Sequence, residues 1–264
     1  MHQVVCADAR EYLPALPDGI ADVVFLDPPY GIKANAKDMS PIARADGRGI
    51  YQGVTETWDM ESETRQEQLD FISWYLAEAK RLVKPSGTVW IMGTYHNIHD
   101  VGHLMLNTDY FILNDIVYIK ANPAPQWRGV RFCNSIESII WARAHGKGPY
   151  YFDYHGLKAL NNNKQMRADW YFPVCRGKER VKDETGKILH QTQKPLALLE
   201  RIVLASVPPD GLIVDFLAGT GTTGIAAALH NRNSLQIERD PRYIEAMQRR
   251  FAALQIPFEL IVHS

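Results

Sequence analysis

The sequence has few cysteines and no long apolar run. Its 264 residues include three cysteines, Cys6, Cys133 and Cys175, and no C-x-x-C pair, so a disulfide framework is not expected. No stretch approaches the roughly 18 consecutive apolar residues of a membrane-spanning helix, and Met1-His2-Gln3 opens no signal peptide. We therefore expect a protein of a reducing compartment, the cytoplasm, with no membrane partner.

The sequence also has little net charge, which at first argues against a partner as acidic as nucleic acid. The formal net charge is −1. Within residues 120–194, however, 14 Lys and Arg stand against 6 Asp and Glu, a balance of +8 that leaves −9 for the remainder. This asymmetry is typical of a local phosphate-binding surface on an acidic protein, although a solvated basic face would have the same composition.

Hydrophobic residues make up 46% of the chain, which is enough for a sizeable core and excludes disorder. Strand-like apolar runs alternate with amphipathic helical patterns, which predicts one α/β domain over residues 1–264 with a doubly wound, mostly parallel sheet. The expected strands are 3–7, 21–26, 88–92, 110–120, 135–141, 212–216 and 234–237. The expected helices are 9–16, 61–83, one from 96, 195–207, 222–230 and one from 241.

Two stretches break this alternation. Residues 31–58 are rich in Gly, Asp and Arg, and we expect a functional loop that can close over a substrate. Residues 145–190 are aromatic, Asn-rich and basic. We expect an insertion that recognises a target there, since amide and guanidinium side chains are those that read base edges.

Three histidines, His96, His99 and His103, share one face of the helix expected from residue 96. Such a face invites a metal interpretation. No matching set of Cys, Asp or Glu residues accompanies them, and a structural or catalytic zinc needs three or four ligands. We therefore expect no metal site.

The expected strand 21–26 delivers Asp27-Pro28-Pro29-Tyr30 to the edge of the sheet where α/β proteins bind ligands. The prolines make this turn stiff. The Asp27 carboxylate and the Pro28 carbonyl could each accept one hydrogen of a nucleobase amine, which would stabilise the positive charge that develops as the nitrogen attacks an electrophile. Tyr30 could stack on a base flipped out of a duplex. A proline-rich turn with a capping Asp and an exposed Tyr is the alternative.

A second candidate site is the glycine-rich stretch 215–224, between an expected strand and an expected helix. Gly219 and Gly221 would let the backbone approach a ligand closely, and the helix N-terminus favours a carboxylate. Glu238 ends the next strand, where an acidic side chain can bind both ribose hydroxyls. Because Gly219-x-Gly221-x-x-Gly224 also matches a dinucleotide fingerprint, a nicotinamide oxidoreductase is an alternative.

Together, Asp27-Pro28-Pro29-Tyr30 and Phe216-Leu217-Ala218-Gly219-Thr220-Gly221 resemble the motifs of the S-adenosylmethionine-dependent amino-methyltransferases of DNA. The catalytic motif comes first, as in the permuted β class. His190-Gln191-Thr192-Gln193-Lys194-Pro195 is similar to that class's H-P-T-Q-K-P, with Gln191 in place of proline. The resemblance implies a Rossmann-like methyltransferase fold and methylation of adenine N6 on a flipped base of double-stranded DNA. N4-cytosine and RNA versions, and a DNA-binding module without catalysis, are alternatives.

The resemblance also implies roles for individual residues. Catalysis belongs to Asp27, Pro28, Pro29 and Tyr30. Contacts with S-adenosylmethionine are expected from Asp8 at the adenine ring, from Glu238 at the ribose, and toward the methionine end from Thr192, Lys194, Asp215, Gly219 and Gly221. Further cofactor contacts are expected from Phe216, Ala218 and Thr222. Contacts with DNA are expected from Arg44, Arg128, Arg131, Arg167, Arg176, Lys178 and Arg180.

Further segments resemble the cell-cycle-regulated adenine methyltransferases, which methylate G-A-N-T-C. They are residues 93–98, 120–125, 128–132, 165–170 and 177–180. Since β-class relatives are often dimers, we expect a homodimer acting at a related site. Two features depart from the subgroup, because Phe216-Leu217 stands where Pro-Phe is common and the sequence ends at Ser264 without the subgroup's C-terminal DNA-binding domain. We therefore expect a lower affinity for the target DNA. Whether a cognate restriction endonuclease is a partner stays open.

Overall fold

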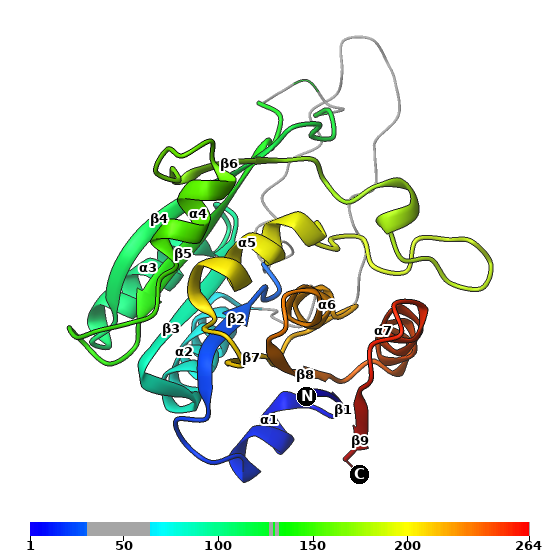
Figure 1. Ribbon diagram of the computed structural model, residues 1–264, viewed down its shortest axis with the longest axis horizontal. Coiled ribbons are helices and arrows are strands. Elements are labelled where there is room, and N and C mark those ends of the chain that lie inside the picture. Colours follow the sequence, from blue (N-terminus) through cyan, green and yellow to red (C-terminus); the bar gives the residue numbers. More distant parts are fainter. Residues whose placement is uncertain (31–63, 127–128, 130–131, 264) are drawn as a thin grey trace.

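The computed structural model describes residues 1–30, 64–126, 129 and 132–263, and within them nine strands form one sheet (Figure 1). The strand order is β6-β4-β5-β3-β2-β7-β8-β1-β9. β5 runs antiparallel to β3 and β4, and every other pairing is parallel. The predicted doubly wound, mostly parallel sheet is confirmed. The strands are β1 His2–Cys6, β2 Ala21–Leu26, β3 Val83–Gly93, β4 Phe111–Lys120, β5 Ile136–Arg143, β6 Asp169–Phe172, β7 Leu212–Asp215, β8 Asn233–Glu238 and β9 Glu259–Val262.

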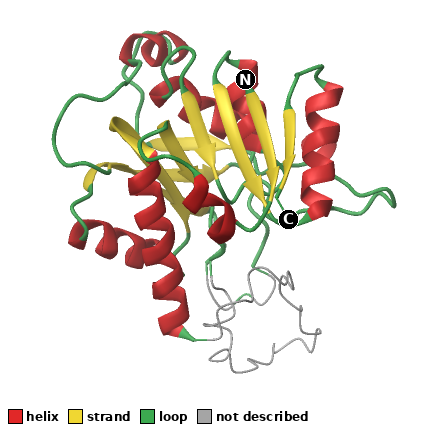
Figure 2. Cartoon of the chain, turned by 90° about the horizontal axis from the view of Figure 1, so that it is seen from below, coloured by secondary structure: helices red, strands yellow, loops and turns green. Residues whose placement is uncertain are grey.

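Helices cover both faces of this sheet (Figure 2). One core contains residues of α1, α2 and α3, and a second core contains residues of α4, α5 and α6. Among the described helices, none combines the length and the apolar character needed to cross a bilayer. The helices are α1 Ala9–Tyr12, α2 Arg65–Leu82, α3 Ile98–Asn107, α4 Tyr154–Leu160, α5 Leu196–Ser206, α6 Thr222–Leu229 and α7 Pro241–Ala253, with 3-10 turns η1 Leu13–Ala15 and η4 Gly177–Glu179.

The local sequence explains features of several of these helices and strands. The Thr64 side chain accepts from the Glu67 N–H and the Glu67 carboxylate accepts from the Thr64 N–H, a capping box that starts α2 at Arg65. β2 is buried at five of its six positions, as expected of a strand covered on both faces. Gly221 precedes α6 with a φ of 74°, a left-handed conformation that glycine adopts without strain.

The insertion expected over residues 145–190 contributes two elements to the main fold. α4 buries Leu157 in the core with α5 and α6, and β6 pairs with the edge strand β4 while burying Trp170 and Phe172. Part of the aromatic content that suggested target recognition therefore covers the sheet. Recognition by the remaining residues of this segment stays a prediction.

Two strands were missed, β6 within the expected insertion and β9 after the last expected helix. β9 follows α7 and pairs with β1, whereas the sequence suggested only a closing helix. Its four residues alternate weakly and three of them are exposed, so the apolar pattern is too short and too diluted to predict a strand.

The parallel strands β1, β2, β7 and β8 finish at the same edge of the sheet. Asp8, Asp27, Asp215 and Glu238 stand at or just after their ends. β4 also ends at this edge with Lys120, and the antiparallel β5 begins there, which adds Glu137. Separate parts of the sequence thus deliver carboxylates to one region.

Candidate active site

A cavity of about 810 Å³ opens at this edge of the sheet. Its walls come from the ends of β1, β2, β7 and β8, from α2, and from residues 190–194. The two candidate sites of the sequence therefore form one cavity. Of the residues predicted for catalysis and cofactor binding, those that line it are Asp8, Asp27, Pro28, Pro29, Tyr30, Thr192, Lys194, Asp215, Phe216, Ala218, Gly219, Thr222 and Glu238.

Gly221 is the predicted cofactor residue that does not belong to the lining. A Cβ atom at this position would lie 2.4 Å from Cγ of Met247 in α7. The close approach that Gly221 permits is therefore between α6 and α7. Gly219 does line the cavity, and a Cβ atom there would lie 3.2 Å from Nε2 of His190.

Asp27 is held from two sides at one end of the cavity. The Tyr30 hydroxyl donates to Oδ1 of Asp27 at 2.7 Å, and Nζ of Lys194 lies 2.5 Å from Oδ2. The Asp27 side chain is 18% exposed, so it keeps access to the cavity. The Gln68 amide donates to the Tyr30 carbonyl at 3.3 Å, which ties the turn to α2.

Tyr30 was expected to stack on a base. Its side chain is buried, it lines the cavity, and its hydroxyl bonds to Asp27. Nζ of Lys194 lies 5.2 Å from the centre of the Tyr30 ring. Stacking on a base stays a prediction, while the contact with Asp27 gives Tyr30 a second role that the sequence did not suggest.

Glu137 and Lys120 complete this end of the site, and neither was singled out in the sequence. Oε1 of Glu137 lies 2.9 Å from Nζ of Lys120, and its Oε2 lies 3.6 Å from Nζ of Lys194 and 3.3 Å from the Tyr30 hydroxyl. The available signal was a lone acidic residue in the apolar strand Ile136–Arg143, because a buried carboxylate needs a partner.

The charged groups of this cluster shift one another's pKa values. Burial raises the pKa of Asp27, and Glu137 adds to the rise while Lys194 opposes it. Burial also acts to raise the pKa of Glu137, but the Lys194 and Lys120 ammonium groups outweigh it and lower that pKa below its ordinary value. For Lys194, burial lowers the pKa, yet the two carboxylates raise it overall. Glu137 and Lys194 are thus charged, and Asp27 is the weaker acid of the two carboxyl groups.

Glu238 and Asp215, at the ends of β8 and β7, are two further carboxyl groups of the cavity lining. Glu238 accepts from the Gly219 N–H and from the Asp240 N–H, both at 2.8 Å, and burial raises its pKa. Asp215 accepts from the Thr223 hydroxyl at 2.6 Å, and burial raises its pKa to about 7. Both carboxylates therefore shape the glycine-rich turn while facing the cavity.

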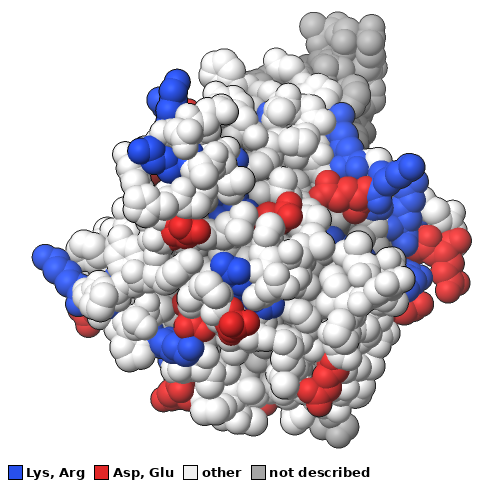
Figure 3. Space-filling model, viewed as in Figure 1, with Lys and Arg blue, Asp and Glu red and all other residues white. Residues whose placement is uncertain are grey.

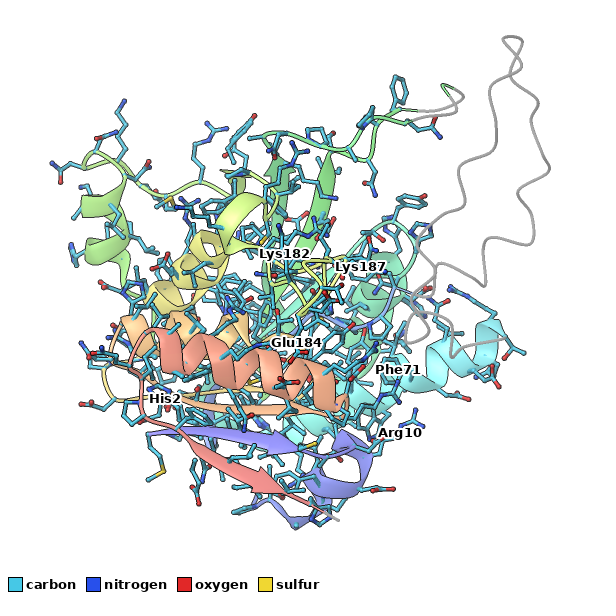
Figure 4. The ribbon with its side chains drawn as sticks, turned by 90° about the vertical axis from the view of Figure 1, so that its right-hand side faces the viewer. His2, Arg10, Phe71, Lys182, Glu184 and Lys187 are labelled. Carbon is cyan, nitrogen blue, oxygen red and sulfur yellow. The ribbon has the colours of Figure 1, made fainter. Side chains whose placement is uncertain are left out.

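An aromatic wall with a positive charge lies beside Asp8. Figure 4 shows Arg10 next to Phe71, and the Arg10 guanidinium lies 5.6 Å from the Phe71 ring centre and 5.2 Å from that of Trp74. The Phe71 and Trp74 rings stack with centres 5.5 Å apart. All four residues line the cavity. This wall suits a planar aromatic ligand, and the sequence did not suggest it.

The predicted DNA contacts lie outside the cavity or outside the described part of the chain. Arg44, Arg128 and Arg131 are not among the described residues. Arg167 pairs with Asp169 at 2.7 Å on the surface. Arg176 and Lys178 are exposed, although Arg176 also donates to the Asn122 carbonyl at 2.9 Å.

Arg180 is embedded in the structure more than its neighbours. Its guanidinium donates to the Gln191 carbonyl at 2.5 Å and to that of Cys175 at 3.5 Å. In Figure 3, Lys and Arg side chains form small groups interspersed with Asp and Glu on the face shown. The described residues on that face therefore do not form a single continuous basic surface.

The three histidines do not converge. His96 contacts the Thr94 hydroxyl through Nδ1 at 3.0 Å, and His103 contacts Asn107 through Nε2 at 3.0 Å. In the described part of the chain, no three His, Cys, Asp or Glu side chains are grouped so that they could hold a metal ion.

Comparison with known proteins adds the family context. Residues 21–249 match the N6_N4_Mtase family model, described as DNA methylase. The chain is 37% identical over 255 residues to the Type II methyltransferase M.HinfI of Haemophilus influenzae, an alignment that covers 97% of this chain and 69% of that protein.

Solved structures share the fold. A putative DNA modification methylase of Thermus thermophilus, solved with S-adenosyl-L-methionine, has a TM-score of 0.66 at 23% identity, with 100% of this chain and 99% of that chain covered. The PvuII DNA methyltransferase, which is cytosine-N4-specific, has a TM-score of 0.68 at 17% identity, with 95% of this chain and 86% of that chain covered. Both likenesses support the mixed α/β methyltransferase fold.

Proposed function

The chain belongs to the N6_N4_Mtase family of DNA methylases, and we propose that it transfers a methyl group from S-adenosylmethionine to N6 of an adenine flipped out of double-stranded DNA. One observation carries this proposal. Asp27-Pro28-Pro29-Tyr30 and the glycine-rich turn with Glu238 line the same cavity, so an amine and a methyl donor can meet there. A DNA-binding module without catalysis would have no need of this juxtaposition.

The donor set fits S-adenosylmethionine. Glu238, fixed by two backbone N–H groups, presents a carboxylate suited to the ribose hydroxyls. Arg10, Phe71 and Trp74 with Asp8 provide a wall for the adenine ring. Asp215 and Lys194 offer opposite charges for the ammonium and carboxylate of the methionine end. When bound, S-adenosylmethionine supplies an activated methyl group, because the C–S bond can break with its electron pair going to sulfur as nitrogen bonds the carbon.

The residues around Asp27 would act on the substrate amine. The Asp27 carboxylate and the Pro28 carbonyl each accept one amine hydrogen and stabilise the positive charge that develops on nitrogen. After transfer the nitrogen loses one proton. Asp27 is suited to receive it, because burial raises its pKa above the ordinary value.

Methylation of cytosine N4 is the second candidate. It needs the same acceptors for an exocyclic amine, and a structural neighbour, the PvuII enzyme, is cytosine-N4-specific. The Asp27-Pro28-Pro29-Tyr30 form of the motif favours adenine by resemblance. The family match sets aside the nicotinamide oxidoreductase that the glycine spacing alone had left open.

Target choice follows from the resemblance to the cell-cycle-regulated adenine methyltransferases. We propose a short site related to G-A-N-T-C, recognised by residues of the 145–190 segment that do not belong to α4 and β6. A homodimer would add a second DNA-binding surface at high effective concentration. A cognate restriction endonuclease is a further proposed partner, since M.HinfI is a Type II methyltransferase.

A single experiment tests the activity, the methylated base and the target site together. The chain is expressed in a host without DNA methylation, and the genomic DNA is sequenced by a method that distinguishes N6-methyladenine from N4-methylcytosine. N6-methyladenine within one short motif is expected. N4-methylcytosine would replace the substrate assignment, an unrelated motif would reject the proposed site, and unmodified DNA from a host that contains the folded protein would reject the activity.

A further inference from the structure

A buried, electrically balanced network lies behind the proposed catalytic carboxylate. It consists of two ammonium groups, two carboxylates and one phenol, from Asp27, Tyr30, Lys120, Glu137 and Lys194. Glu137 and Lys194 are 9% and 7% exposed. Neither Glu137 nor Lys120 lines the cavity, so they act on the substrate only through the residues between.

Both oxygens of Asp27 are already engaged. Oδ1 accepts from the Tyr30 hydroxyl at 2.7 Å and Oδ2 pairs with Lys194 at 2.5 Å. A substrate amine that bonds to Asp27 must therefore displace one of these donors or share an oxygen with it. A displaced donor would lose the Asp27 oxygen that it now holds, which is costly for a buried hydroxyl and more so for a buried ammonium. Lys194 would keep the Thr192 carbonyl, to which its ammonium donates at 3.3 Å.

Glu137 offers both donors a second acceptor. Its Oε2 atom lies 3.6 Å from Nζ of Lys194 and 3.3 Å from the Tyr30 hydroxyl, which are the two groups that hold Asp27. Lys120 holds the opposite oxygen, Oε1, at 2.9 Å and so keeps Oε2 directed at the site. Small movements of Lys194 or Tyr30 would transfer their hydrogen bonds from one carboxylate to the other.

We propose that Glu137 is a positioning residue that takes over the hydrogen bonds of Lys194 and Tyr30 when the substrate amine binds Asp27. The inference rests on the proposed methyl transfer and deepens it. Glu137 suits this role because the neighbouring ammonium groups lower its pKa, so it remains a carboxylate acceptor at neutral pH. In turn it helps to raise the pKa of Asp27, which would receive the proton.

The test compares Glu137→Gln with the wild-type chain in single-turnover methylation of duplex DNA, with S-adenosylmethionine saturating. The variant should be about 100-fold slower, the loss expected when a reacting group is misplaced by about an ångström. Its affinity for S-adenosylmethionine, measured by calorimetry, should stay close to that of wild type. Glu137→Asp keeps the charge and should recover part of the rate, which keeps the test valid if Glu137→Gln folds poorly.

A second comparison distinguishes the transfer of hydrogen bonds to Glu137 from an effect of the net charge of the buried cluster. Glu137→Gln leaves Lys120 without a carboxylate, whereas Lys120→Met with Glu137→Leu restores a neutral cluster but removes both Glu137 oxygens. Lys194 then keeps the Thr192 carbonyl at 3.3 Å but loses the acceptor to which its hydrogen bond would pass. The double variant should remain slow, and a wild-type rate would overturn the proposal. The pH–rate profile gives another readout, because the loss of Glu137 removes a charge that raises the pKa of Asp27. The acid limb should move to lower pH.

The outcomes distinguish this inference from the function on which it rests. A wild-type chain that methylates no DNA would refute the proposed methyl transfer. An active wild-type chain together with a folded Glu137→Gln variant of equal rate and unchanged pH profile would refute only the role of Glu137.

Discussion

The ammonium nitrogen of Lys194 lies 2.5 Å from the Oδ2 atom of Asp27. This ion pair joins residues of two motifs that are 167 positions apart in the sequence. Lys194 is expected at the methionine end of the methyl donor and Asp27 at the substrate amine, so the pair marks where the two ligands would meet. Substitutions on either side of it should therefore separate binding from methyl transfer.

Asp27→Asn should slow methyl transfer by at least roughly 100- to 1000-fold, the loss typical of one preorganised electrostatic group. Its amide can present N–H groups to the substrate amine and to Lys194, where acceptors are needed. Single-turnover kinetics with calorimetric titration of S-adenosylmethionine would measure both effects. Asp18→Asn is the matched control, since Asp18 is 78% exposed beside Arg81. A rapid Asp27→Asn variant would remove Asp27 from the catalytic assignment.

Glu238→Gln should weaken binding of S-adenosylmethionine by about 1.5–3 kcal/mol, the usual worth of hydrogen bonds to a charged group. Glutamine is preferred to alanine because its amide oxygen can still accept from one of the two N–H groups, of Gly219 and Asp240, that Glu238 now holds. Glu245→Gln on the exposed surface of α7 is the control. NAD should bind to none of these proteins, and tight NAD binding by the wild-type chain would count against the methyl-donor assignment.

The affinity for S-adenosylmethionine should increase as the pH rises toward about 7, the pKa to which burial raises Asp215. Below this pH the free protein holds a proton on Asp215, and a cationic ligand must displace it. The change should be about tenfold per pH unit below the pKa if one proton is released, and it should level off above. Calorimetry between about pH 5.5 and 8.5 would measure it. Asp215→Asn should lose the dependence, and an unchanged dependence in that variant would assign it to another group.

Much of this site could be predicted because its parts are local. A strand followed by Asp27-Pro28-Pro29-Tyr30, or by a glycine-rich turn and a helix, is visible in adjacent residues, and the edge of a parallel sheet then brings such turns together. Glu137 and Lys120 were missed because their meeting depends on how β4 pairs with β5, in which Tyr118 lies opposite Glu137. Periodicity does not predict strand register across 17 residues, 137 minus 120.

For Gly221, the sequence predicted the need for a glycine, but the structure gives another reason for it. Its glycine character was attributed to a ligand, whereas the neighbour that a side chain would meet is Met247, which is 26 residues further on, 247 minus 221. The packing of α7 against α6 cannot be inferred from the turn itself. The guanidinium of Arg180 likewise bonds to the backbone of residues 175 and 191, which its basic character did not predict, while its contact with DNA stays a prediction.

Gly221→Ala should destabilise the fold by about 2–4 kcal/mol, through left-handed strain and overpacking against Met247. Gly186→Ala is a matched control for strain alone, because its φ is +82° and, apart from Gly186 and its two chain neighbours, no described residue has a heavy atom within 4 Å of the added Cβ. It should cost about 1 kcal/mol. Chemical denaturation would measure both, and Met247→Ala should partly rescue Gly221→Ala. Equal losses at the two glycines would show that the contact with Met247 is unimportant.

DNA binding should depend on salt through Arg176 and Lys178, which are exposed. Changing both to Gln should reduce the slope of log affinity against log salt by up to about two units if each neutralises a phosphate. Lys80→Gln with Lys84→Gln, at the opposite end of the sheet, makes the same charge change and should leave the slope nearly intact. Arg180→Gln should mainly lower stability, because this guanidinium holds the Gln191 carbonyl. If both double variants flatten the slope equally, the effect comes from net charge, and the 176–178 cluster is only a solvated basic face.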